Sequence, residues 1–410
     1  MSATGSGFRR RTAIKGALAA GLSGPALSAL LTACGTKHTS TAGQKIPSPT
    51  NPVTWPLSSA NPAIAAGQMP KRGSTLRIYN YADYLSPRVL KDFEKKYGVT
   101  IHLSTFNDAD EALTKVAAKK LGFDLYFPSY DSLGKLIESD LLRPLTRDYL
   151  TNYDNLWDSQ QDPWYDRGAR YTVPYTVYST GIGWRTDLAS GDIAGMDNPY
   201  DALWDTKYAG NVAILDDWHT AMSMVLLRNG IDNINTTSST DLALIRKQIL
   251  ELRSTMHPKV TISMYTDMPA GQYGLAQFWS GDAINMPYYL PKSVSPDVLR
   301  YWFPSDGKGE VDNDLVVCLA QGQNPVAAHF FINAILDNDI AKQNFGYTGY
   351  QPPLKKFTPD SLVAQGYVPK NLSSAVVLEE DFKTGFPLLQ LPPDSDTAWH
   401  QVWQEFKAGG

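Results

Sequence analysis

Three tyrosines and an aspartate lie close together in the segment LRIYNYADYLSP, residues 76–87. The alternation of apolar and polar residues over 76–80 predicts a β-strand, and the Ser-Pro pair that ends the segment predicts the start of a helix. Tyr81, Asp83 and Tyr84 therefore fall in a loop after the carboxyl end of a strand, where α/β sheets bind ligands. Aromatic faces beside a carboxylate suit a flat or cationic ligand, although ordinary loop tyrosines would give the same pattern.

The same residue types follow other predicted strands. The strand FDLYFPS ends in a polar loop that contains Ser129 and Asp131. Further along the chain, NVAILDDWH predicts a strand that runs into Asp217, and GLAQFWSGDAINM predicts one that ends in Trp279 and Asp282. Strand ends at a common edge bring such side chains together, so these residues form a candidate ligand-binding site.

The elements that position these residues alternate as strand and helix. From residue 76 to 142 the pattern is β-α-β-α-β followed by a short helix, which predicts a parallel sheet with covering helices. The extended segment YTVPYTVYSTGIGWRTD, residues 171–187, is long enough to cross between two lobes. The strand NDLVVCLA, residues 313–320, is expected to return to the first lobe, so the two crossings would make a hinge.

The length of the folded part also favours two lobes. About 340 residues follow the N-terminal region, which is long for one hydrophobic core. The predicted first lobe comprises residues 73–178 with 310–347, and the predicted second lobe comprises residues 179–309 with 348–410.

The N-terminus is predicted to be an export signal. RRRTAIKG resembles a twin-arginine signal, and the apolar run 17–31 is short for a transmembrane helix. It ends in LTAC, which resembles the lipobox of bacterial lipoproteins and predicts lipidation of Cys34. Residues 1–33 would be the signal peptide. Residues 34–72, rich in Ser, Thr, Pro, Ala and Gly, would be a lipid-anchored flexible tether.

Charge and cysteine content narrow the classes of partner. Residues 1–45 hold six Lys or Arg and no acid, so 46–410 hold 31 basic residues (37 − 6) against 41 acidic ones, a formal charge of −10. This balance argues against nucleic acid as a partner and suits a cationic ligand. The chain has only two cysteines. If Cys34 is lipidated, Cys318 has no partner and is expected to be a small core residue.

Common catalytic motifs are absent from the sequence. It has no HExxH, no glycine-rich phosphate loop and no GxSxG in the exported part, and its six histidines show no metal-ligand spacing. His219 beside Asp216 and Asp217 is a weak metal pattern. We therefore expect no cofactor and no enzymatic activity, although a carboxylate pair of a surface hydrolase is an alternative.

Several segments together resemble a known family. LRIYNYADYLSP, FDLYFPS, VPYTVYSTGIG, WDTKYAGNVAILDD, FWSGDA and FGYTGYQPP occur in the order found in spermidine/putrescine-binding proteins of bacterial ABC importers. The resemblance extends from about Leu76 to the C-terminus. It implies an α/β, two-lobed periplasmic-binding-protein fold (type II) with crossover hinge strands, closing over a ligand and then docking on a permease with its ATPase. We expect a monomer that contacts the membrane only through the lipid on Cys34.

The resemblance also implies site residues. Motif by motif, it assigns ligand-binding positions to Tyr81, Asp83, Tyr84, Ser129, Asp217, Trp279 and Gln390. Three positions depart from the family pattern: Thr220 and Asn313 replace acids, and Val311 replaces a tryptophan. The predicted ligand is a small cationic amine such as putrescine or spermidine. Another small amine, an aminophosphonate or a sugar is the alternative within binding proteins.

Overall fold

Ten strands form one mixed sheet in the order β2-β1-β3-β10-β5-β8-β6-β7, with β4 beside β10 and β9 beside β5. The structure is a computed structural model that describes residues 46–118 and 122–409. The strands are β1 (Thr75–Tyr81), β2 (Thr100–Phe106), β3 (Leu125–Tyr126), β4 (Leu142–Arg143), β5 (Thr172–Arg185), β6 (Val212–Leu215), β7 (Lys259–Thr261), β8 (Leu275–Trp279), β9 (Leu299–Trp302) and β10 (Glu310–Leu319).

Helices cover this sheet. The α-helices are α2 (Pro87–Tyr97), α3 (Ala109–Ala117), α4 (Leu133–Glu138), α5 (Asp158–Gln161), α6 (Trp218–Arg228), α7 (Ser239–Met256), α8 (Met264–Asp267), α9 (Ser280–Asn285), α10 (Pro325–Ile335), α11 (Asn338–Thr348), α12 (Pro359–Ala364), α13 (Asp381–Thr384) and α14 (Pro393–Ala408). The helix predicted from the Ser-Pro pair is α2, which has Pro87 in its first turn and ends at Gly98 in the left-handed conformation (φ 66°).

The sheet has two parallel groups of strands. In the first half of the sheet, β1 runs parallel to both β2 and β3. In the second half, β6 runs parallel to both β7 and β8. The predicted α/β fold with parallel strands is therefore confirmed. The strand predicted to run to Asp282 ends at Trp279, because Ser280 begins α9. The C-terminal helix α14, which the sequence analysis did not predict, packs on α6 and α7.

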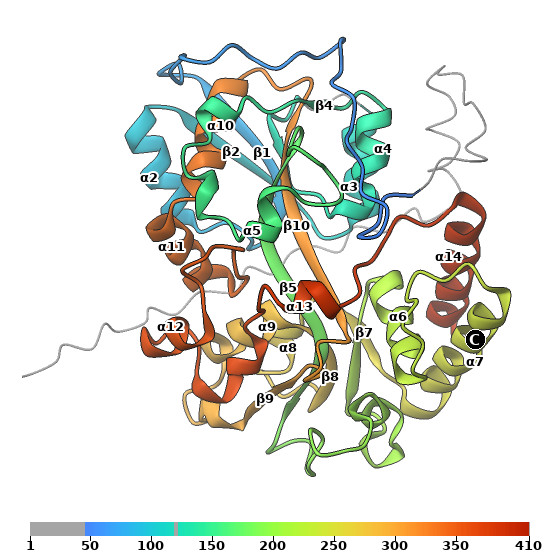
Figure 1. The fold of residues 1–410 in the computed structure, drawn as a ribbon. Helices are drawn as coiled ribbons and strands as arrows, with labels where there is room; N and C mark the ends of the chain where they lie inside the picture. The colour runs from blue at the N-terminus through green and yellow to red at the C-terminus, as the bar shows by residue number, and fades with distance from the viewer. Residues whose placement is uncertain (1–45, 119–121, 410) are drawn as a thin grey trace, which may run out of the picture. The chain divides into compact units, whose positions relative to one another are not determined.

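Two long antiparallel strands join the halves. β5 pairs with β10 and β9 along one edge and with β8 along the other (Figure 1). The β5–β10 pairing is regular from Glu310 to Asp314 and shifts before Leu315, which lies opposite Pro174. Proline has no N–H to give to a ladder, so a bulge at this point is expected. β10 pairs with β3 of the first group and β5 pairs with β8 of the second, so the two long strands lie between the groups.

The prediction of a flexible tether after the signal peptide does not hold for the described part of that segment, residues 46–72. Trp55 is buried, and its indole N–H donates to the carbonyl oxygen of Tyr165 at 2.8 Å. The guanidinium of Arg170 donates to the carbonyl oxygen of Trp55 at 2.6 Å. The Ser- and Pro-rich composition hid this packing, because one buried tryptophan and side-chain donors to the backbone fix a segment that has no secondary structure.

Several sequence predictions lie outside the described residues. The signal peptide and Cys34 fall within residues 1–45, whose structure is not described. The residues that the structure describes belong to one compact unit, so the boundaries of the two lobes remain a prediction. Cys318 is a buried free thiol, as expected for a core residue.

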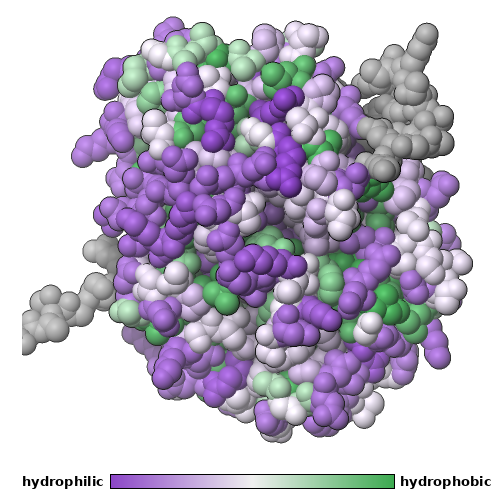
Figure 2. Space-filling view, viewed as in Figure 1, coloured by the Kyte–Doolittle hydropathy of each residue, from purple (hydrophilic) through white to green (hydrophobic). Residues whose placement is uncertain are grey.

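The described residues contain no helix that could span a membrane. Among residues 46–118 and 122–409, no helix combines the length and the apolar character that a membrane span requires. On the face shown in Figure 2, hydrophilic residues predominate and hydrophobic residues lie in separate small groups.

Candidate ligand-binding site

Strand ends from both halves of the sheet meet beside β10. Tyr81 ends β1, and Asp217 follows β6 as the N-cap of α6. Desolvation raises the pKa of Tyr81 well above its usual value, and the charges of Asp314, Asp217 and Asp131 raise it further. The structure thus brings together three residues from strand ends, Tyr81, Asp131 and Asp217. Asp314, from the middle of β10, joins them.

Five aromatic side chains surround this point, and we call them the aromatic box. Tyr84 packs edge-on against Tyr81 at 5.7 Å and against Tyr350 at 4.9 Å between ring centroids. Tyr178 lies 6.0 Å from Tyr350 and 6.2 Å from Trp279. The indole N–H of Trp279 is buried and has no hydrogen-bond partner among the described residues. An aromatic box of this kind attracts a cation through its ring faces and covers the methylene groups beside it.

Carboxylates lie within the box. The hydroxyl of Tyr84 donates to Asp314 Oδ2 at 2.7 Å, and the hydroxyl of Tyr350 donates to Asp282 Oδ1 at 3.0 Å. Both acids are buried, and desolvation raises the pKa of each to about 7. Asp282 Oδ2 is buried with no hydrogen-bond partner in the described part of the chain.

A second group of acids lies further along β10 and at α6. Glu310 and Asp312 are buried, and desolvation raises the pKa of both carboxyls above the usual range. Asp217 accepts a hydrogen bond from the backbone N–H of Thr220 at 2.9 Å, and desolvation raises its pKa to about 6. Burial thus disfavours the charged form of every one of these carboxyls.

No basic side chain compensates for this charge. Within residues 46–118 and 122–409, none of the five acids has a Lys, Arg or His nitrogen within 4.0 Å; they are Asp217, Asp282, Glu310, Asp312 and Asp314. Burying a carboxylate without a counter-charge is costly, so buried charges are normally paired. The site is therefore built to receive positive charge from outside the chain or to hold protons in its absence.

Ser129, Asp131 and Gln390 lie at the edge of the acidic region. The hydroxyl of Ser129 donates to Asp131 Oδ1 at 2.5 Å. A pocket here is bounded by the N-terminal segment, α4 and the segment before α14; its lining residues are Pro47, Trp55, Tyr130, Asp131, Leu133, Gly134, Trp164, Tyr165, Leu389 and Gln390. The sequence-predicted pair Asp131 and Gln390 thus shares one small hollow next to the buried acids.

Three predicted site residues, Asp83, Asn313 and Thr220, do not offer a free polar group to the group of buried acids. Asp83 is exposed, has a positive φ of 54°, and accepts hydrogen bonds from Tyr265 at 3.3 Å and Tyr347 at 3.2 Å. Asn313 donates to the hydroxyl of Tyr165 at 2.9 Å and lies on the opposite face of β10 from its acidic neighbours. Thr220 is buried and donates to Glu310 rather than standing free.

Sequence reasoning missed five residues of the site. The missed residues are Tyr178, Glu310, Asp312, Asp314 and Tyr350. The segment EVDND held a usable signal, since acids at every second position of a strand share one face. Tyr350 lay in the quoted segment FGYTGYQPP, but nothing in the sequence indicated that its ring would reach a strand end of the other half.

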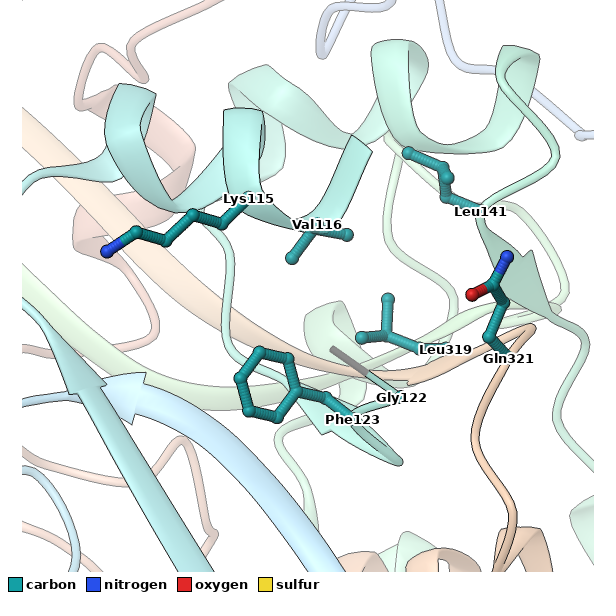
Figure 3. A pocket seen from close by; sticks show the side chains of 7 residues that line it. All are labelled: Lys115, Val116, Gly122, Phe123, Leu141, Leu319 and Gln321. Atoms are coloured by element: carbon teal, nitrogen blue, oxygen red, sulfur yellow. The ribbon is translucent and has the colours of Figure 1, made fainter. Parts of the chain in front are cut away.

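Two other features carry no part of this site. The pocket of Figure 3 lies beside α3, and none of the acids above lines it; its lining residues are Lys115, Val116, Gly122, Phe123, Leu141, Leu319 and Gln321. No group of three or more His, Cys, Asp or Glu side chains in the described residues is arranged to hold a metal ion. The weak metal pattern at His219 finds no support, because the ring is buried and stacks on Trp218.

Comparisons with known proteins define the class. Residues 88–367 match the family described as Bacterial extracellular solute-binding protein, and this chain belongs to that family. Its members bind solutes for ABC importers and are not enzymes, so the expectation of a non-enzymatic transport component is confirmed.

The particular relatives are proteins of the group named in the sequence resemblance. The chain is 28% identical over 286 residues to the spermidine/putrescine-binding periplasmic protein of Escherichia coli, covering 68% of this chain and 78% of that protein. It is 25% identical over 363 residues to the putrescine/agmatine-binding protein of Pseudomonas aeruginosa, covering 85% of this chain and 95% of that protein. Its fold matches the crystal structure of the spermidine/putrescine ABC transporter substrate-binding protein PotD from Streptococcus pneumoniae with a TM-score of 0.66 at 21% identity, covering 82% of this chain and 99% of that one.

Proposed function

We propose that this chain captures a linear polyamine for its ABC importer. The observation that carries the proposal is a group of four buried carboxylates, with the half-buried Asp217 beside them, that have no basic partner in the described residues and lie against an aromatic box. Ammonium groups would neutralise the carboxylates through charge-assisted hydrogen bonds, and the ring faces would cover the intervening methylenes. The printed names of the relatives in Escherichia coli and Pseudomonas aeruginosa point to the same ligand class.

The alternatives fit the site less well. A sugar would use the aromatic faces but would leave the buried negative charge without a partner. An aminophosphonate would bring a phosphonate of the same sign as the carboxylates, which is repulsive at close range. Neither objection depends on the names of the relatives.

Titration calorimetry with putrescine, spermidine and a neutral sugar tests this function. Asp314→Asn should weaken amine binding by about one to two decades, because a hydrogen bond to a charged group is worth about 1.5–3 kcal/mol. Asp83→Asn is the matched control, since Asp83 is exposed and already bonded to two tyrosines. Sugar binding without amine binding, or equal effects of the two variants, would contradict the proposal.

The capture step would include closure of two lobes about the β5–β10 pair. The support is that these two strands connect the halves of the sheet and that site residues come from both halves (Figure 1). Small-angle scattering should show a smaller radius of gyration when a saturating polyamine is added. An unchanged radius would count against closure.

The membrane attachment that we propose is a lipid on Cys34. Its support is the order of paired arginines, apolar run and LTAC in the sequence. Two or more acyl chains give stable anchoring. Cys34→Ala should move the protein from the membrane fraction to the soluble fraction of the cell envelope. Firm membrane association of this variant would rule the lipid anchor out.

A further inference from the structure

β10 carries an acid at every second residue, which we call the acidic ladder: Glu310, Asp312 and Asp314. Because the β5–β10 register is unbroken over these residues, their side chains lie on one face of the sheet. Alternate residues of a strand are about 6.7 Å apart, so the ladder extends over about 13 Å. Amines separated by three or four methylenes repeat at a comparable interval.

Glu310, the first rung, is oriented by three hydroxyl groups. Its Oε1 accepts from Thr180 at 2.8 Å and from Thr220 at 3.1 Å, and its Oε2 accepts from Ser223 at 2.6 Å. A carboxylate offers about four acceptor positions, so one on Oε2 is left. The sequence comparison had suggested a lost acid at Thr220; here the Thr220 hydroxyl instead holds a carboxylate that β10 supplies.

Asp312, the middle rung, has an acceptor that nothing satisfies. Its Oδ1 accepts from the hydroxyl of Tyr130 and from the backbone N–H of Leu388, the latter at 3.1 Å. Its Oδ2 is buried and has no hydrogen-bond partner in the described residues, and the whole residue is only 4% exposed. An unsatisfied buried carboxylate oxygen between two further acids requires a donor, and a cationic donor is the most favourable one.

Asp314, the third rung, opens toward the aromatic box. It accepts from Tyr84 at 2.7 Å, and Tyr178 lies on the paired strand directly opposite Asp312, the second rung. The three rungs are 1%, 4% and 6% exposed in chain order, so the ladder is shielded from water along its length. Shielding strengthens each ionic hydrogen bond that a ligand makes there.

We propose that the acidic ladder pairs with three cationic centres of one extended linear triamine and that Glu310 is the residue that makes this chain prefer a triamine to a diamine. The proposal rests on the proposed function, which requires only that an amine binds. A diamine satisfies two neighbouring rungs and leaves Glu310 or Asp314 unused. A triamine places its central ammonium at the unsatisfied Asp312 Oδ2 and its ends at the outer rungs.

Calorimetry of the exported protein with spermidine and putrescine, on wild type and Glu310→Gln, tests this. Glu310→Gln should lose about tenfold to a hundredfold in spermidine affinity and less than about fivefold in putrescine affinity. Glu380→Gln, at an exposed position, is the matched control and should change neither. If Glu310 had only a structural role, Glu310→Gln would lower the affinities for spermidine and putrescine by the same factor. That result would overturn the proposal.

A wild-type measurement keeps the test independent of how Glu310→Gln folds. Spermidine is compared with the diamine of the same chain length, in which a methylene replaces the central nitrogen. The ladder predicts about tenfold or greater preference for spermidine, because the diamine leaves Asp312 Oδ2 unsatisfied. Equal affinities would overturn the ladder while leaving the proposed function intact; a wild type that binds no amine would overturn both.

Discussion

His400 Nε2 lies 3.4 Å from Asp110 Oδ2, and the two side chains come from opposite halves of the sheet. Asp110 is on α3, which packs on β2, whereas His400 is on α14, which packs on α6 and α7. Asp396, one turn before His400, lies 3.7 Å from its Nδ1. Desolvation lowers the pKa of His400, but the hydrogen bond to Asp110 and the interactions with Asp396 outweigh it and raise the pKa above its usual value.

This pair should stabilise the arrangement of the two halves in a pH-dependent way. Because the pKa of His400 is raised on folding, its contribution is complete below the unfolded value of 6.5 and is lost as pH rises through the folded pKa. His400→Gln should therefore lower the free energy of unfolding at about pH 5.5 by up to about 1 kcal/mol and change it little at about pH 8.5, since a half-exposed pair is worth no more. Urea denaturation at the two pH values measures this. Asp110→Asn should reproduce the loss, and a loss that is the same at both pH values would exclude an ionic origin.

The acids of the candidate site should make the ligand-free protein less stable as pH rises. The pKa values of Asp217, Asp282 and Asp314 are raised to about 6, 7 and 7, so the native state binds more protons than the unfolded chain between about pH 4 and about pH 7. Stability falls with rising pH wherever the native state holds the extra protons. Thermal unfolding at about pH 5 and about pH 7.5 should show this fall, and saturating spermidine should remove it because the ligand replaces the protons. A neutral sugar serves as the control ligand, and an equal fall with and without spermidine would contradict the assignment.

Trp279 should contribute to amine affinity through its ring face. It lies 6.2 Å from Tyr178, and its side chain belongs to the second half of the sheet while Tyr84 belongs to the first. Trp279→Leu should weaken amine binding by about 0.5–2 kcal/mol, the range for a cation on an aromatic face. Calorimetry measures the change, with Tyr288→Leu at a 44% exposed position as the control. If the control weakens binding as much as Trp279→Leu, the aromatic box is not the cause.

The sequence predicted the strand ends and both crossing strands, but it did not predict that one face of β10 carries acids of the candidate site. Tyr81, Tyr84, Asp217 and Trp279 could be named as candidate site residues because a strand followed by a loop has a local signature, and the family resemblance pointed to the same loops. The acids of β10 were missed because the sequence alone does not show which face of this strand meets the ligand. That face depends on the pairing of β10 with β5, which joins residues more than 100 positions apart. Asp83 shows the reverse case: its loop was identified, but its left-handed backbone directs it to Tyr265 and Tyr347 at the surface.

The N-terminal segment should be part of the folded domain and not a free tether. Trp55 is 6% exposed and packs in the same core cluster as Tyr130 and Tyr165. Trp55→Ala should lower the free energy of unfolding by about 3–5 kcal/mol, because it leaves a cavity and removes the donor to the Tyr165 carbonyl oxygen. Leu57→Ala, two residues away and 59% exposed, is the matched control and should stay within about 0.5 kcal/mol of wild type. Urea denaturation of the three proteins decides the matter, since equal midpoints would mean that the segment does not stabilise the domain and that the tether extends to residue 72, as the sequence predicted.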